Sequence, residues 1–252
     1  EPFIASVDAA IEDFAARGID EFVLDLRYNP GGRIVASQNL ANSLAPQSDV
    51  SNEEVFVRYQ YNEILEQAYR EQGGAESPNL VVRFSEDPGN LNLDPVVFLT
   101  TGSSASASEL LINGLKPYMD VVTVGQNTFG KFYGAFVLND SNTRSGNPPP
   151  RHNYAIVPVT LKYANANGVT DFRDGLVPDY EVEESLINAV AIGDTTDPLL
   201  GKALEVITGE QQEPVAKRMP YSPFEVLPDH KKLKQGNIFY DDPARLPMLK
   251  NQ

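Results

Sequence analysis

The stretch PVVFLTTGSSASASELLINGLKPY, residues 95–118, predicts a buried strand, a serine-rich turn and a helix. Residues 95–101 form a short continuous apolar run, which is typical of a strand covered on both faces. The segment 107–118 places three leucines on one helical face: Leu110, Leu111 and Leu115. A strand that leads through a turn into a helix predicts an α/β fold.

A second unit of the same kind lies upstream, where EFVLDLR (21–27) predicts a strand, NPGG (29–32) a turn and residues 34–45 a helix. The two strands of residues 132–140 and 154–168 are expected to form a hairpin around a Pro-rich loop. The other expected helices are 4–17, 62–72 and 197–208, and the other expected strands are 55–62, 79–85 and 121–125.

Composition and charge exclude several kinds of functional site and partner. The chain has 252 residues, no cysteine and a net charge of −15, so we expect no disulfide, thiolate metal site or cysteine nucleophile, and no nucleic-acid partner. No apolar run approaches the ~20 residues of a membrane span. We expect a core over residues 1–209 and a Pro-rich C-terminal extension over 210–252.

The serine cluster Ser103, Ser104, Ser106 and Ser108 has two interpretations. Hydroxyls at a helix start commonly cap the free backbone N–H groups. They can also supply a nucleophile, because α/β proteins keep their sites at the carboxyl ends of the strands, where helix N–H groups can stabilise an oxyanion.

Two further segments follow strand ends. In LRYNPGG (26–32) the paired glycines either allow a tight turn or bring a backbone N–H close to a substrate carbonyl. In VGQNTFGKF (124–132), Lys131 is either a solvated side chain or a general base, since loss of water lowers the pKa of an ammonium. His152 and His230 lie in no context that suggests a catalytic triad.

Together, VLDLRYNPGG, TGSSASASELLINGLKPY and VVTVGQNTFGK resemble the motifs of the carboxy-terminal processing, or tail-specific, serine proteases. In that family an LR-x-N-x-GG turn, an SASASE segment and a TFGK segment occur in this order, and the lysine lies 25 positions after the middle serine, as Lys131 does after Ser106. The stretch DGLVPDYEVEE (174–184) is also similar to the family.

The resemblance implies an α/β fold of the ClpP/crotonase-like kind, with βαβ units and added β-hairpins. It implies a serine endopeptidase without metal or cofactor, in which Ser106 is the nucleophile and Lys131 the base. The implied oxyanion hole consists of N–H groups of Ala107 and of the Gly31–Gly32 turn, with Gly32 favoured. Arg27 and Glu109 are motif residues expected to act as scaffold, as a charge pair.

The family also implies protein or peptide substrates cut near their C-termini, a PDZ domain upstream of Glu1 or a homo-oligomer as partner, and export to a bacterial periplasm or cell envelope. The chain departs from the family pattern at Phe132, where a glycine is usual, and at Ala135, where many members have a glutamine that orients the lysine. A non-catalytic ligand- or peptide-binding protein on the same fold therefore stays an alternative.

Overall fold

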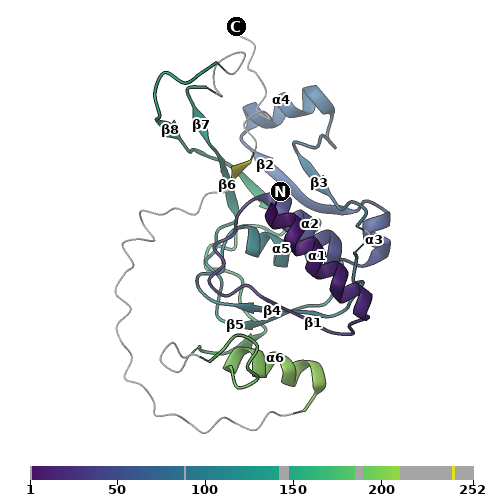
Figure 1. The fold of residues 1–252 in the computed structure, drawn as a ribbon. Helices are drawn as coiled ribbons and strands as arrows, with labels where there is room; N and C mark the ends of the chain where they lie inside the picture. The colour runs from purple at the N-terminus through teal and green to yellow at the C-terminus, as the bar shows by residue number, and fades with distance from the viewer. Residues whose placement is uncertain (1, 88, 142–147, 185–189, 211–239, 242–252) are drawn as a thin grey trace, which may run out of the picture.

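A computed structural model of the chain describes residues 2–87, 89–141, 148–184, 190–210 and 240–241. The expected α/β architecture is confirmed (Figure 1). Most of the expected C-terminal extension, 211–239 and 242–252, lies outside the described residues, as does His230. Within the described ranges, no helix is long and apolar enough to cross a membrane.

The first sheet is parallel and carries the two strand–turn–helix units. Its strand order is β1-β4-β5-β10, with β1 at Phe22–Asp25, β4 at Val96–Thr100, β5 at Val121–Gly125 and β10 at Tyr180–Glu181. The parallel registers β1–β4 and β4–β5 align the carboxyl ends of these three strands along one edge of the sheet. The serine turn, the glycine turn and the segment before Lys131 all leave from that edge.

The second sheet has the order β11-β6-β9-β2-β3. Its strands are β2 (Val55–Tyr61), β3 (Val81–Arg83), β6 (Tyr133–Phe136), β9 (Val159–Ala164) and β11 (Tyr240–Asp241). All pairs are antiparallel except β11–β6. The expected hairpin is confirmed, because β6 pairs with β9, and β7 (Leu138–Asn139) pairs with β8 (Ala155–Ile156).

Helix α5 (Ala107–Leu115) lies between the sheets, and all nine of its residues are buried. It packs on α2 (Ile34–Leu44), which in turn contacts α1 (Pro2–Arg17), and it also contacts β2 and β9. Helix α6 (Pro198–Thr208) packs on β4 and β5 from the opposite side (Figure 1). The remaining helices are α3 (Gln47–Ser51) and α4 (Glu63–Gly73).

The burial of strand β4 on both faces explains why its sequence is a continuous apolar run. Val96 and Phe98 belong to the large core around α5, whereas Val97 and Leu99 belong to the smaller core under α6. Alternate side chains of a strand point to opposite faces, so a strand covered on both faces must be apolar at every position. The pairs of β10 and β11 and the five-residue α3 were not predicted, since such short elements carry little sequence periodicity.

Candidate active site

Ser106 lies at the sharp turn between β4 and α5, with φ +69° and ψ −116°. This backbone conformation is unfavourable for a residue with a side chain and costs about 1–3 kcal/mol, so the surroundings must hold it. Two hydrogen bonds of neighbouring residues fix this conformation. The Ser104 hydroxyl donates to the carbonyl of Leu26 at 2.8 Å, and the Ala105 N–H donates to the carbonyl of Asn29 at 3.0 Å. The serine turn is thereby attached to the segment that follows β1.

Ser108 makes a similar attachment, because its hydroxyl donates to the Asn29 carbonyl at 3.1 Å. Ser104 and Ser108 therefore bind the neighbouring turn and shape the segment, and the hydroxyl of each is engaged with a carbonyl. Ser106 differs from both, since it occupies the positive-φ position at the start of α5.

The carboxylate of Glu109 is fully buried and organises the site. Its Oε2 accepts the N–H of Ser106 at 2.6 Å and the N–H of Lys131 at 2.9 Å. Its Oε1 accepts the Thr128 hydroxyl and the Gly130 N–H, both at 2.6 Å. Four donors converge on one buried carboxylate, which satisfies a charge that would otherwise be costly to bury.

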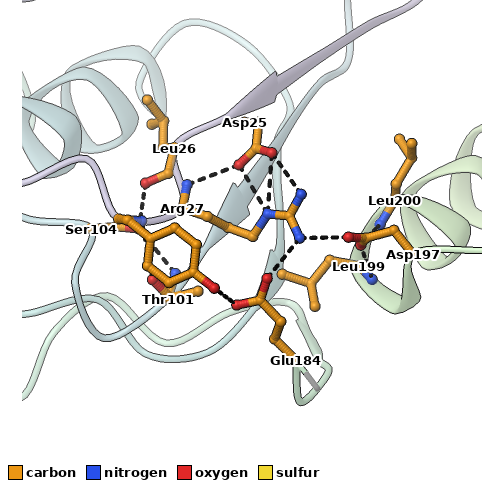
Figure 2. A network of polar contacts seen from close by, with 10 residues as sticks. Asp25, Leu26, Arg27, Thr101, Ser104, Glu184, Asp197, Leu199 and Leu200 are labelled. Atoms are coloured by element: carbon orange, nitrogen blue, oxygen red, sulfur yellow. Dashed lines mark hydrogen bonds and ion pairs between the residues drawn. The ribbon is translucent and has the colours of Figure 1, made fainter. Parts of the chain in front are cut away.

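The expected charge pair between Arg27 and Glu109 is wrong. The Arg27 guanidinium instead contacts three other carboxylates, from Asp25, Glu184 and Asp197, as Figure 2 shows. The motif spacing could not reveal these partners, because Glu184 and Asp197 lie more than 150 positions downstream.

The Arg27 cluster attaches the end of β1 to α6. Asp197 caps α6 by accepting the N–H groups of Leu199 and Leu200, and it also accepts from Arg27 at 2.7 Å. Burial raises the pKa of the Asp197 carboxyl, but hydrogen bonds and charge from Arg27 and the helix N–H groups outweigh it and leave that pKa below its ordinary value. The Tyr28 hydroxyl donates to Glu184, and burial followed by this contact raises the pKa of Tyr28 to about 12.

The glycine turn runs directly against the serine turn. Gly31 has φ +93°, and a Cβ on it would lie 2.6 Å from Ala105 O, Ala107 N and Ser106 Cβ. Only glycine fits there. The Gly31 N–H donates to Asn29 Oδ1 at 2.9 Å, so this donor is engaged within the turn. A Cβ on Gly32 would meet nothing within 4 Å.

An apolar pocket of about 290 Å³ opens beside the glycine turn. Gly31, Gly32 and Ala107 are among the residues that line it. The apolar lining comes from α1, α2, α5 and the end of β1: Ile4, Val7, Leu26, Leu40 and Leu111. The structure thus brings together at one pocket all three backbone positions that the sequence indicated for an oxyanion hole.

Lys131 is 6% exposed, which contradicts a solvated side chain. Burial lowers the pKa of its amine and the charge of Glu109 raises it, and the balance leaves the pKa at about 8. The turn before Lys131 is held by the downstream stretch 174–184, which is also similar to the family. The Thr128 N–H donates to Leu176 O at 3.1 Å, and the Leu176 N–H donates to the Thr128 hydroxyl at 2.7 Å.

The two departures from the family pattern are both buried. Phe132 packs edge-on against Phe172 in the main core. Ala135 is 6% exposed on β6 and faces Val159 of β9 in the register. Sequence reasoning also missed Tyr163, a fully buried tyrosine of β9 whose hydroxyl reaches the carbonyls of Ser106 and Lys131. In the sequence it was marked only by its place within the expected strand 154–168.

Comparison with known proteins identifies the family and the fold of the chain. The profile of peptidase family S41 matches residues 3–182. A carboxyl-terminal-processing protease of Synechocystis sp. is 29% identical over 203 residues, which cover 79% of this chain and 40% of the relative. A crystal structure from Bacteroides fragilis, named as a candidate S41 protease, superposes with a TM-score of 0.66 at 29% identity, covering 81% of this chain and 49% of that one.

The fold is also that of a photosystem II D1 C-terminal processing protease, with a TM-score of 0.50 at 21% identity, over 73% of this chain and 40% of that chain. The expected ClpP-like α/β fold is thereby confirmed. The chain spans about two fifths to one half of the length of these three proteins.

Proposed function

Since the chain belongs to peptidase family S41, we propose that it is a serine endopeptidase that cuts protein or peptide substrates near their C-termini with Ser106 and Lys131. One observation carries the proposal: Glu109 Oε2 accepts the backbone N–H of both residues, so the nucleophile and a buried lysine are held at one carboxylate oxygen. This shared acceptor supports a common site for the two motif residues.

The lysine environment supports the base role. A general base works best when its pKa is near the working pH, and burial leaves the pKa of Lys131 at about 8. A substantial fraction of the amine is then neutral in mildly alkaline solution. Neutral Lys131 takes the proton of Ser106 Oγ as that oxygen attacks the peptide carbonyl.

The resulting oxyanion accepts the N–H groups of Gly32 and Ala107, and the Lys131 ammonium returns its proton to the leaving amine. Water then attacks the acyl-enzyme, with Lys131 again as base, and releases the carboxylate product. Gly32 is favoured over Gly31 as the donor because the Gly31 N–H is engaged by Asn29.

We propose the wider setting from the family resemblance alone. The catalytic core corresponds to residues 1–209, a PDZ domain or a second copy of the chain assists substrate binding, and the protein acts after export. The relative from Synechocystis sp. is a carboxyl-terminal-processing protease, which favours C-terminal tails as substrates.

Ala135 favours a second candidate function. A small buried apolar side chain stands where many members orient the lysine with a glutamine. A protein that binds peptides without cleaving them would tolerate this loss.

Peptide cleavage tests both functions. The protein and its Ser106→Ala variant are incubated with a mixed peptide library, and products are identified by mass spectrometry at pH 8.5. The matched control is Ser103→Ala, which changes a serine of the same turn. Products formed by wild type and Ser103→Ala but absent with Ser106→Ala support the peptidase. Peptide binding without any products would support the second function and refute the first.

A further inference from the structure

Tyr163 reaches the site from the second sheet. It lies on β9, is fully buried, and its backbone N–H donates to Phe132 O at 3.1 Å, next to Lys131. Its hydroxyl lies 2.5 Å from the Lys131 carbonyl oxygen and 3.1 Å from the Ser106 carbonyl oxygen. One phenol thus contacts the peptide groups of both the nucleophile and the base.

Tyr163 and Glu109 bind opposite ends of the same residues. Glu109 accepts the N–H of Ser106 and of Lys131, whereas Tyr163 donates to the C=O of Ser106 and of Lys131. The Ser106 carbonyl also accepts the Leu110 N–H at 2.8 Å, the first hydrogen bond of α5. The two residues are therefore linked on both their N–H and C=O sides, by side chains from different elements.

We propose that Tyr163 is a positioning residue, whose hydroxyl fixes the Ser106 turn and the Lys131 segment relative to each other by binding both carbonyls. This inference rests on the proposed peptidase function. Proton transfer between serine and lysine depends steeply on their separation, and a misplacement of about 1 Å costs about 100-fold in rate. A link between the two backbones is therefore a direct way to preserve the rate.

The phenol donates to these carbonyls in its protonated form. Burial raises the pKa of Tyr163 well above its ordinary value, and the nearby carboxylate of Glu109 raises it further. The hydroxyl keeps its proton throughout the working range and shares it between two carbonyl acceptors. Tyr163 therefore takes no part in the proton transfers themselves.

Tyr163→Phe tests this role, since it removes one oxygen and keeps the ring that packs near Phe172. We expect kcat to fall about 10- to 100-fold while KM stays within about twofold, the pattern of a lost geometric constraint. The matched control is Tyr118→Phe, because the Tyr118 hydroxyl also donates to a backbone carbonyl, that of Val55 at 2.6 Å. Both variants should lower the melting temperature by similar amounts, but Tyr118→Phe should keep the wild-type kcat.

A second readout does not depend on activity. Competitive labelling of lysine amines, followed by mass spectrometry of the Lys131 peptide over a pH range, gives the pKa of that amine directly. A loosened site admits water, so Tyr163→Phe should move the Lys131 pKa upward and Tyr118→Phe should leave it unchanged.

The outcomes separate the two proposals. If wild type cleaves peptides and Tyr163→Phe keeps both its kcat and its Lys131 pKa, the positioning role is overturned. If wild type cleaves nothing, the peptidase proposal fails. In that case an upward shift of the Lys131 pKa in Tyr163→Phe still supports the link between the two segments, and an unchanged pKa overturns it.

Discussion

The carboxylate of Glu109 accepts the backbone N–H of Lys131 at 2.9 Å, although the two residues are 22 positions apart in the chain. The same oxygen accepts the N–H of Ser106. Ser106, which follows β4, and Lys131, which follows β5, therefore share one hydrogen-bond acceptor. The backbone position of each residue depends on that acceptor.

Glu109→Gln should damage both stability and activity. A glutamine amide presents an N–H₂ to two of the four donors, which leaves buried N–H or O–H groups unsatisfied and costs about 2–4 kcal/mol in the free energy of unfolding. Urea denaturation measures this, and the peptidase rate should fall about 100-fold or more. The control is Glu66→Gln on α4, which pairs with Arg70 near the surface and should cost under about 0.5 kcal/mol. Equal losses for both variants would contradict the organising role of Glu109.

Lys131 makes activity and stability depend on pH in linked ways. In the proposed mechanism the neutral amine is the base, so kcat/KM should rise with pH and level off above an apparent pKa of about 8. The folded-state pKa lies below the unfolded value of about 10.5, so below pH 8 the folded protein bears the cost of a buried ammonium. That cost disappears as pH rises from about 8 to about 10.5, and stability should increase across this window.

Lys131→Met should therefore abolish cleavage while stabilising the fold at pH 7 by about 1–3 kcal/mol, a gain that vanishes near pH 10.5. Thermal melts at pH 7 and pH 10 measure the difference. Lys162→Met on β9 is the control, because Lys162 pairs with Asp171 at a side-chain exposure of 41% and should show no such gain. A Lys131→Met protein less stable than wild type at pH 7 would refute the buried-ammonium interpretation.

The local features of the fold were predictable from sequence. The continuous apolar run of β4 is dictated by burial on both of its faces. The leucine periodicity of 107–118 identified α5 as a helix, and both elements occur as expected. The turn between them was identifiable because Ser106 lies in a motif that the family resemblance marks. The pairing of the stretches 132–140 and 154–168 was also correct.

Contacts between distant segments were not predictable. Arg27 and Glu109 stood out as a complementary pair of motif charges, yet each has partners that the fold brings in from elsewhere. Whether a buried charge is satisfied by another charge or by backbone N–H groups depends on three-dimensional geometry, which no local pattern encodes. Tyr163 was missed for the same reason, since the sequence pattern of a strand tyrosine is the same whether its hydroxyl contacts water or the carbonyls of Ser106 and Lys131.

Arg27→Lys should loosen the attachment of α6. A guanidinium contacts three carboxylates with several donors at once, but an ammonium cannot reproduce that planar arrangement. We expect a loss of about 1–3 kcal/mol, against about 0.5 kcal/mol or less for the control Arg17→Lys, whose exposed pair with Asp13 contributes little. Hydrogen exchange should show faster opening of α6 in Arg27→Lys, and unchanged exchange there would contradict the attachment.

Adjacent glycines should respond differently to alanine. In Gly31→Ala the new Cβ would lie 2.6 Å from backbone of Ala105 and Ala107 at a φ of +93°, so the two turns must separate. We expect a loss of more than about 3 kcal/mol together with loss of cleavage. Gly32→Ala meets nothing within 4 Å and should leave the melting temperature within a few degrees of wild type. Equal melting temperatures for both variants would show that the turns do not pack as described.

The strained backbone of Ser106 predicts that glycine is a more stable replacement than alanine at this position, the reverse of the usual order in a helix. Ser106→Ala keeps a Cβ at φ +69° and ψ −116° and therefore keeps the backbone strain. Ser106→Gly relieves this strain of about 1–3 kcal/mol, and the greater loss of backbone entropy by glycine on folding offsets part of the gain. Ser106→Gly should therefore be more stable than Ser106→Ala by about 1 kcal/mol in urea denaturation. At Gln67, exposed on α4, the order should reverse, with glycine about 1 kcal/mol less stable than alanine. If alanine were the more stable replacement at both positions, the strained conformation of the serine turn would be refuted.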